Sequence, residues 1–455
     1  MNNRKGNLMM HELRESDSPI VPEKPANKAD VKMPVAELAE ERGLAKGNAL
    51  KHSKVRTQGR VALSEKLLRI RQASKKKGGQ LTALYHHIYS TETLEAAFYS
   101  LKRKAAPGKD RVTWKEYEQN LACNLAVLSN RLKVGTYRPE PVERCYISKR
   151  DGRKRPIGIP VIEDKIVQKA AVLVLNQVYE EEFKNFSYGF RPERSQHNAL
   201  DALNVALEKR QINWILDCDI QGFFDHLSHE WLIQFIRHRI SDKRIIRLIK
   251  GWLQAGVLKE GDLQCTEEGT PQGGSISPLL ANIYLHYVLD LWEIWWRKHR
   301  ARGEVIIVRF ADDFVVGFQY NRDAKRFWKE LRIRLQKFSL NLNEQKTRLV
   351  HFGRYAKRDR AKYGKGRPET FEFLGFTHIC STSRYGHFLV IRKTSAKRMR
   401  LKLKELKQEL RKRLLCCTGN RRQSTGCREM AKIRSFRPLP LFWCTLQLGE
   451  TSCFL

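Results

Sequence analysis

VIIVRFADDFVVGFQ, at residues 305–319, consists of two apolar runs on either side of an acidic turn. β-Branched and aromatic residues favour strands, so residues 305–310 and 314–319 predict a β-hairpin with Asp312 and Asp313 at its tip. Adjacent aspartates repel each other, and a bound divalent cation would offset that repulsion. Asp is also common in solvated turns, so the pair needs a third carboxylate nearby before it indicates a metal site.

A second predicted strand supplies that carboxylate. WILDCDI, at residues 214–220, places Asp217 and Asp219 two residues apart and therefore on the same face of a strand. An unpaired carboxylate is costly among apolar residues. We expect one of the two to bind metal and the other to be a hydrogen-bonded structural residue, but their spacing does not decide which is which. Carboxylates on neighbouring strands are what two-metal nucleotidyl transfer requires.

The chain is strongly basic. Its 455 residues include 86 Lys and Arg against 49 Asp and Glu, which gives a formal net charge of +37. Charge of this size repels itself, and a polyphosphate backbone relieves the repulsion, so we expect a nucleic-acid partner. The length is enough for about three domains with a sizeable core.

Neither a membrane nor a secretory destination is expected. The most hydrophobic window, residues 276–296, carries Asp290 and Glu293 and is too polar for a bilayer span. The N-terminal residues have neither the apolar core of a signal peptide nor the composition of a transit peptide. The ten cysteines form no CxxC pair, so no zinc site is expected. We predict a protein of the reducing cytoplasm, and no pattern in the sequence specifies its oligomeric state.

Further segments around these aspartates occur in an order that is similar to the reverse-transcriptase domain of group II intron-encoded proteins. RFADDFVVGF resembles the aspartate-pair box of that family, and DIQGFFDH resembles its first catalytic-aspartate box. The resemblance runs from about residue 63 to residue 413. The other matching segments are DGRKRPIGIP (151–160), SYGFRPERSQHNAL (187–200), GTPQGGSISPLLANIYLH (269–286), NEQKTRLVHFG (343–353) and FEFLGF (371–376).

The resemblance implies an α+β fold of the right-hand polymerase type, with fingers, a palm and a helical thumb that is cut short. The palm would carry Asp219, Asp312 and Asp313 on a small antiparallel sheet. The implied organisation is a flexible basic leader, an N-terminal extension with fingers, a palm, the start of a thumb or maturase domain, and an atypical tail, at residues 1–62, 63–212, 213–378, 379–415 and 416–455 respectively.

The resemblance also assigns roles to single residues. It favours Asp219 over Asp217 as the third catalytic carboxylate, with two Mg²⁺ ions as cofactors. The other implied residues are a triphosphate clamp (Lys149, Arg155), a steric gate that selects deoxynucleotides (Phe224), a template–nucleotide contact (Gln272, Gly273), a candidate general acid (Lys346) and a primer grip (Phe373, Leu374, Gly375). Ordinary alternatives compete with several of these roles: a solvated basic hairpin for the clamp, a surface lysine for Lys346, and core packing for the primer grip.

The implied activity is RNA-directed DNA polymerisation by an intron-encoded protein that also binds intron RNA to assist splicing and mobility. Its partners would be intron RNA, an RNA template, a DNA primer or target, and deoxynucleoside triphosphates. One alternative is an RNA-binding splicing cofactor whose polymerase site is idle. Another is a bacterial reverse transcriptase outside introns. A protein that only binds RNA has no need of three metal-facing aspartates and an aromatic gate, which favours the enzyme.

The resemblance stops near residue 415. Residues 392–413 predict a basic amphipathic helix with Met399, Leu403, Leu406 and Leu410 on one face. The tail that follows has five cysteines and no helical periodicity. We interpret it as the product of a frameshift, which would impair maturase function more than polymerase chemistry.

Overall fold

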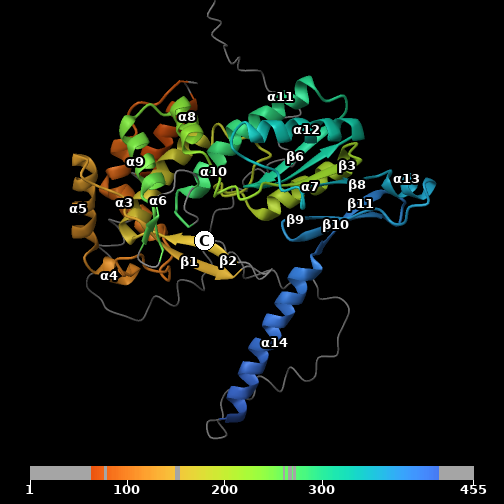
Figure 1. Ribbon diagram of the computed structural model, residues 1–455. Helices are drawn as coiled ribbons and strands as arrows, with labels where there is room; N and C mark the ends of the chain where they lie inside the picture. The colour runs from red at the N-terminus through yellow and green to blue at the C-terminus, as the bar shows by residue number, and fades with distance from the viewer. Residues whose placement is uncertain are drawn as a thin grey trace, which may run out of the picture. The chain divides into compact units, whose positions relative to one another are not determined.

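The computed structural model describes residues 63–75, 79–148, 154–259, 262–264, 269 and 273–419 (Figure 1). It divides into two compact units. The first contains the described residues up to Leu374 together with Ile379–Ile391, and the second contains Gly375–His378 and the described residues from Arg392 onward. The predicted leader, Lys149, Gln272 and most of the predicted tail lie outside the described residues.

Helices make up most of the N-terminal part of the first unit. Residues 63–75 are helical, and α6 is the central helix, because α2, α3 and α10 all pack against it. Its Ile166, Ala170 and Val174 lie four residues apart and are fully buried, as expected for one face of a helix. The helices before and including α6 are α2 (Tyr85–Tyr89), α3 (Thr91–Ser100), α4 (Trp114–Gln119), α5 (Leu121–Val134) and α6 (Ile162–Tyr179).

A four-stranded sheet accompanies these helices, in the order β2-β1-β4-β5. β1 and β2 form an antiparallel pair that carries Arg155. β4 joins β1 in parallel and pairs with β5 in antiparallel fashion. The four strands are β1 (Val142–Ser148), β2 (Lys154–Ile159), β4 (Val257–Lys259) and β5 (Asp262–Gln264).

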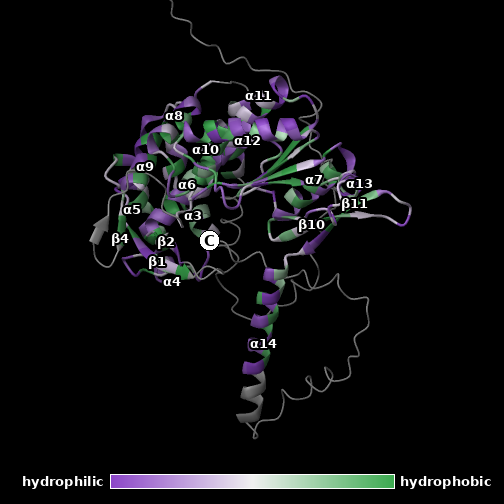
Figure 2. Cartoon of the chain, turned by 45° about the vertical axis from the view of Figure 1, so that its right-hand side comes forward, coloured by the Kyte–Doolittle hydropathy of each residue, from purple (hydrophilic) through white to green (hydrophobic). Residues whose placement is uncertain are grey.

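A second four-stranded sheet contains the two strands that were expected to carry the aspartates. Its order is β6-β7-β3-β8, and each neighbouring pair is antiparallel. Helices α7 and α12 pack on it, and its interior strands are coloured as hydrophobic in Figure 2. The elements are α7 (Gln196–Lys209), β3 (Trp214–Asp219), β6 (Val305–Phe310), β7 (Asp313–Phe318), α12 (Asn321–Gln336) and β8 (Arg348–His351). The predicted hairpin of residues 305–319 is confirmed.

The long helix that follows β5 and precedes β6 in the chain is interrupted. α10 (Ser277–Leu285) passes into a π-helical turn, η2 (His286–Asp290), and then into α11 (Leu291–His299). A π turn inserts one residue into the helical repeat, which rotates the side chains that follow it. Nearly all residues of α10 are buried, so no polar face shows the change of phase that this insertion causes.

The remaining elements complete both units. Within the first unit they are α8 (His229–Arg239), α9 (Lys243–Gln254), α13 (Ala356–Lys362) and β9 (Phe371–Phe373). β9 forms a three-stranded sheet with β10 (Phe376–Thr382) and β11 (Phe388–Thr394). The helix of the second unit, α14, spans Ala396–Gly419, so the first three residues of the predicted 392–413 helix belong to β11 instead. No helix among the described residues is long and apolar enough to cross a bilayer.

Candidate active site

Two of the predicted catalytic aspartates face each other across neighbouring strands. Asp219 is the last residue of β3 and Asp313 is the first residue of β7, and the antiparallel register pairs them directly. Side chains in such pairs have Cβ atoms about 4.5–5.5 Å apart. Asp312 precedes Asp313 in the β6–β7 turn, directly after Ala311, whose φ of 57° lies in the left-handed region. The three carboxylates therefore come to the same end of the sheet.

Lys346 contacts this group. Its Nζ atom lies 3.0 Å from Oδ1 and 2.9 Å from Oδ2 of Asp219. The loop that carries Lys346 is fixed to the end of β3, because the Asn343 amide donates to the Asp219 carbonyl at 2.8 Å and the Thr347 amide donates to the Asn343 carbonyl at 2.8 Å. The ammonium group neutralises one of the three carboxylates.

The other two carboxylates bind protons more tightly than usual. Burial raises the pKa of Asp312, and the charge of Asp219 raises it further, although a hydrogen bond from its own backbone and the charges of Arg155 and Lys346 oppose this. The pKa of Asp313 rises from 3.8 to about 7, first through loss of hydration and then through repulsion by Asp312 and Asp219. The Asp313 side chain is nevertheless open to solvent, so water screens part of that repulsion.

Asp217, which the sequence left as an alternative to Asp219, has a different partner. It pairs in register with Arg348 of β8, and the Arg348 Nε atom lies 3.5 Å from its Oδ2 atom. Loss of hydration raises its pKa to about 6 despite the arginine. An aspartate with its own cation on the next strand fits the structural role that we expected for one member of this pair.

The donor set fits a divalent cation in its chemistry. Carboxylate oxygens are the ligands that Mg²⁺ prefers, and a dication would relieve the repulsion that raises the pKa values of Asp312 and Asp313. Within the described part of the chain, however, no three or more His, Cys, Asp or Glu side chains gather closely enough to hold a metal ion. Lys346 takes up both oxygens of Asp219 instead.

The two adjacent phenylalanines after β3 differ in their exposure to solvent. Phe223 is 2% exposed and packs edge-on against Tyr284, with ring centroids 6.3 Å apart. Phe224 is only partly buried and lies edge-on to Phe223 at 5.3 Å. Phe223 is therefore a core residue, whereas the ring of Phe224 remains accessible near the end of β3.

Two other predicted residues connect the first sheet to this region. Arg155 lies on β2, and its charge lowers the pKa of Asp312. Gly273 has a φ of 118°, and a Cβ atom there would lie 2.4 Å from the Gly158 carbonyl oxygen of the same strand. Only glycine allows this approach of the two backbones. Lys149 and Gln272, predicted beside them, lie outside the described residues.

The predicted primer-grip residues form a turn with unusual backbone conformations. Phe373 is buried on β9, and Leu374 and Gly375 have φ values of 51° and 78°. The Gln196 Nε2 atom donates to the Leu374 carbonyl at 2.5 Å, which fixes this turn to the start of α7. The buried position of Phe373 equally fits the core-packing alternative.

A buried arginine that was not among the predicted site residues lies beside the aspartate turn. Arg309 is fully buried on β6 and donates to both carboxylate oxygens of Asp290, at 2.8 and 2.5 Å. Its Nη1 atom donates to the Asn282 side chain and to the Ala311 carbonyl, both at 3.1 Å. The sequence signal for it was an arginine inside the apolar run VIIVRF. A charge buried in such a run requires a partner, so this arginine could have been expected to form an ion pair.

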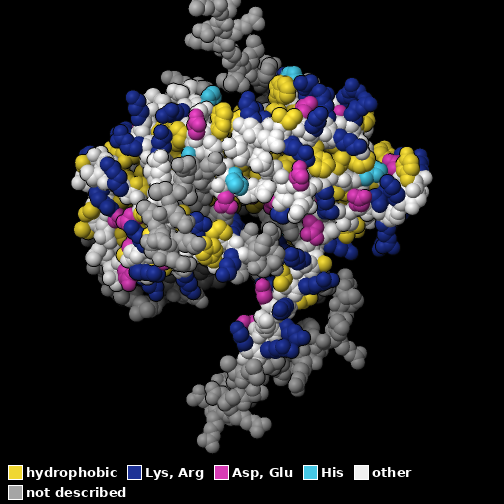
Figure 3. All heavy atoms as spheres, viewed as in Figure 1, with side chains coloured by type: hydrophobic (Ala, Val, Ile, Leu, Met, Phe, Trp, Pro, Cys, Tyr) yellow, Lys and Arg dark blue, Asp and Glu magenta, His cyan; other side chains and the backbone are white. Residues whose placement is uncertain are grey.

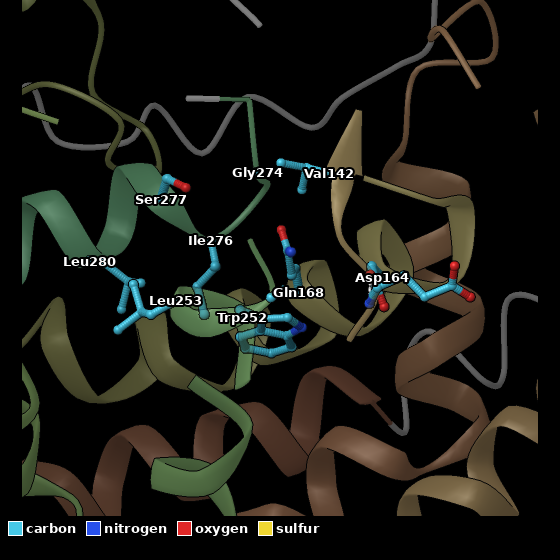
Figure 4. A pocket seen from close by; sticks show the side chains of 11 residues that line it. Val142, Asp164, Gln168, Trp252, Leu253, Gly274, Ile276, Ser277 and Leu280 are labelled. Carbon is cyan, nitrogen blue, oxygen red and sulfur yellow. Dashed lines mark hydrogen bonds between the residues drawn. The ribbon is translucent and has the colours of Figure 1, made fainter. Parts of the chain in front are cut away.

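A small pocket lies between α6, β1 and the start of α10 (Figure 4). Gly274 closes it above Gln168, whose buried Oε1 atom has no hydrogen-bond partner within the described part of the chain. Asp164 lines another side, and its carboxylate accepts a hydrogen bond from the Glu140 amide at 2.9 Å. The space of about 20 Å³ has room for about one water molecule, so this pocket is too small for a nucleotide.

Comparison with known proteins gives a consistent family. Residues 147–378 match the model of the reverse transcriptase (RNA-dependent DNA polymerase) family. Protein YkfC of Escherichia coli is 34% identical over 333 residues, which cover 65% of this chain and 82% of YkfC. The group II intron-encoded protein LtrA of Lactococcus lactis is 34% identical over 278 residues, and a 91 kDa protein in a cob intron of Schizosaccharomyces pombe is 41% identical over 181. The matched segments cover 46% and 22% of these two relatives, so the chain spans less than half of either.

The raised pKa of Asp313 predicts a dependence of stability on pH when divalent cations are chelated. The carboxyl titrates near 3.8 in the unfolded chain and near 7 in the folded protein, so the folded state holds more protons between these values. We expect the free energy of unfolding to fall as the pH rises from about 4 to about 7. Asp313→Asn should flatten this fall, although Asp217 will preserve part of it.

Urea unfolding in EDTA across this pH range measures the effect. Asp201→Asn, on the exposed side of α7, serves as the matched control and should keep the wild-type dependence. Equal pH dependences for the wild-type protein and Asp313→Asn would contradict the described crowding of the carboxylates.

Proposed function

The chain belongs to the reverse transcriptase family of group II intron-encoded proteins, which are RNA-directed DNA polymerases, and we propose that it extends a DNA primer on an RNA template at Asp219, Asp312 and Asp313. The observation that carries this proposal is the pairing of Asp219 with Asp313 across β3 and β7, with Asp312 beside them in the turn. Carboxylates from two adjacent strands therefore meet at one end of the sheet, which supports this role.

Members of the family use divalent metal ions, and we propose two Mg²⁺ ions held by the three aspartates. Cations bound there would lower the pKa of the primer 3′-hydroxyl group and offset the charge of the leaving pyrophosphate. The crowded carboxylates support the proposal, because their raised pKa values measure a repulsion that added positive charge would relieve. Lys346 would have to leave Asp219 for that oxygen pair to serve as a ligand.

The surrounding side chains suit the handling of a triphosphate. Lys346 is half-exposed, and its ammonium group would donate a proton to pyrophosphate once it leaves Asp219. Arg155 already acts electrostatically on Asp312, so its positive charge is near enough to attract the phosphates of an incoming nucleotide. Phe224 would exclude a ribose 2′-hydroxyl group with its accessible ring.

We further propose that the chain binds intron RNA and its RNA template chiefly through phosphate contacts. Lys and Arg side chains are spread over the visible face of the first unit and along α14 (Figure 3). Contacts of this kind release counterions, so the affinity for RNA should fall steeply as salt is added. The proposed location is the cytoplasm, where intron transcripts would be available.

Asp312→Ala or Asp313→Ala should reduce primer extension by at least about 100-fold, because each removes a carboxylate that supports the developing charges. Binding of a labelled RNA–DNA duplex should persist, since it depends on Lys and Arg residues elsewhere. Single-turnover addition of one deoxynucleotide and a filter-binding assay measure the two quantities. Near wild-type extension by Asp312→Ala would favour an RNA-binding protein whose polymerase site is idle.

Phe224→Ala should raise the ratio of ribonucleotide to deoxynucleotide incorporation by on the order of 10-fold or more, because the lost ring opens space for a 2′-hydroxyl group. Phe223→Ala is the matched control. It should keep the wild-type ratio but lower the free energy of unfolding by about 3–5 kcal/mol, as a large-to-small change in the core does. An unchanged ratio in Phe224→Ala would remove the steric gate from the mechanism.

Intron splicing tests the role of the C-terminal tail. The family-like pattern ends near Leu415, so we expect weak splicing by the native chain and recovery when residues 416–455 are replaced by the helical continuation from the alternative reading frame. Self-splicing intron RNA in low magnesium provides the assay, with a chain ending at Leu415 as the control. If the native chain splices as well as the repaired chain and the shortened chain does not, the tail is functional and the frameshift hypothesis is wrong.

A further inference from the structure

Stability alone does not explain the ion pair between Arg309 and Asp290, because both side chains are completely buried. Removing two charges from water costs about as much as their attraction returns, and an apolar pair of similar size is often as stable or more stable. The guanidinium group also binds other parts of the chain. Three of its nitrogen atoms make four hydrogen bonds, and only two of these bonds go to Asp290.

One of the other two bonds reaches the turn before Asp312 and Asp313, and the other reaches α10. Arg309 Nη1 donates to the carbonyl of Ala311, the residue that immediately precedes Asp312. Ala311 is buried and has a φ of 57°, a conformation that L-residues adopt rarely and only when their surroundings hold it. The same Nη1 atom donates to Asn282 of α10. The guanidinium group therefore ties a strained peptide at the turn to two points on the interrupted helix.

Residues 186–189 also bind Arg309 and Asn282. The Arg309 amide donates to the Phe186 carbonyl at 2.9 Å, and the Tyr188 amide donates to the Arg309 carbonyl at 2.8 Å. Asn282 Nδ2 donates to the Gly189 carbonyl at 2.7 Å. A Cβ atom on Gly189 would lie 2.3 Å from the Ala311 nitrogen, so residues 186–189 pack directly on the turn.

A second buried arginine stiffens that segment. Arg191 pairs with both carboxylate oxygens of Glu180 through its Nε atom and donates from Nη1 to the carbonyls of Lys184 and Ser187 at 2.7 and 2.8 Å. Arg191 therefore fixes the backbone of residues 184–187, next to the residues that pack on the turn. Rigid supports of this kind are what a catalytic group needs to hold its orientation.

We propose that Arg309, Asp290 and Asn282 form a positioning clamp that fixes the Ala311 peptide and thereby orients Asp312 and Asp313. None of the three touches the reacting atoms. The clamp sets the rate of nucleotide addition through the placement of the carboxylates, and the binding of primer and template does not depend on it. This inference rests on the proposed catalytic role of Asp312 and Asp313.

The test must separate positioning from folding, because removal of one partner would leave a buried unpaired charge. The double variant Arg309→Met with Asp290→Leu removes both charges and keeps an apolar pair. We expect cooperative unfolding and unchanged affinity for an RNA–DNA primer–template, with kcat for single-nucleotide addition lowered on the order of 100-fold, as for a small misplacement of reacting groups. Arg309→Lys keeps the charge but loses the forked geometry, and should fall between the double variant and the wild type.

Hydrogen exchange provides a readout that does not depend on activity. Peptides covering residues 186–191 and 309–314 should exchange faster in the double variant, whereas peptides from α5 should not change. Tyr284→Phe is the matched control on the same helix, since it removes a buried hydrogen bond to the Phe338 carbonyl that does not reach the turn. It should lower stability and leave kcat and the exchange of these peptides unchanged.

Each outcome decides the proposal. Wild-type kcat in a folded double variant overturns the clamp, and so does an equal loss of kcat in Tyr284→Phe. If the double variant does not fold, Asn282→Leu, which introduces no charge, takes its place, and a folded Asn282→Leu protein with wild-type kcat overturns the clamp as well. Asp312→Ala, assayed in parallel, separates the catalytic role of Asp312 from the positioning role of the clamp. If Asp312→Ala stays active, the catalytic assignment is wrong. If Asp312→Ala is inactive and the double variant is fully active, only the clamp is rejected.

Discussion

Three carboxylates that repel one another are held at one end of a sheet. The strand register, a neighbouring ammonium group and a buried guanidinium group hold them there. The antiparallel register brings Asp219 opposite Asp313. Lys346 neutralises Asp219, and Arg309 holds the peptide before Asp312. The repulsion that remains is visible in the raised pKa values of Asp312 and Asp313. A site with uncompensated negative charge is prepared for cations and for the phosphates that accompany them.

Close approach of backbones extends this framework beyond the sheet. Gly189 packs on the Ala311 peptide, and Gly273 packs on strand β2 at Gly158. At both places a Cβ atom would overlap the neighbouring backbone, so glycine is required for contact and not only for flexibility. The first contact supports the turn that carries Asp312, and the second brings the segment after residue 272 against the hairpin that carries Arg155. Elements far apart in the sequence thereby surround one small region.

Local patterns were sufficient for the strands that carry the aspartates. The apolar runs at residues 305–310 and 314–319 form β6 and β7, and residues 214–219 form β3. The spacing of Asp217 and Asp219 did not decide between them, and the resemblance favoured Asp219. The partner of Asp217 could not be predicted from local sequence, because Arg348 lies on a strand 131 residues later in the chain. The π turn was also not predictable, because nearly all residues of α10 and η2 are buried and no polar face shows the change of phase that an inserted residue causes. The sequence likewise does not show which residue pairs with a buried charge such as Arg309. The helix predicted from residue 392 begins at Ala396 because β11 continues through Thr394.

The most direct test is a structure of the protein with an RNA template, a chain-terminated DNA primer, a deoxynucleoside triphosphate and Mg²⁺. The account predicts metal density bound by Asp219, Asp312 and Asp313, with Lys346 moved from Asp219 toward the phosphates and the Arg309 contacts unchanged. Metal bound elsewhere, or Lys346 still paired with Asp219 while the nucleotide is bound, would contradict it.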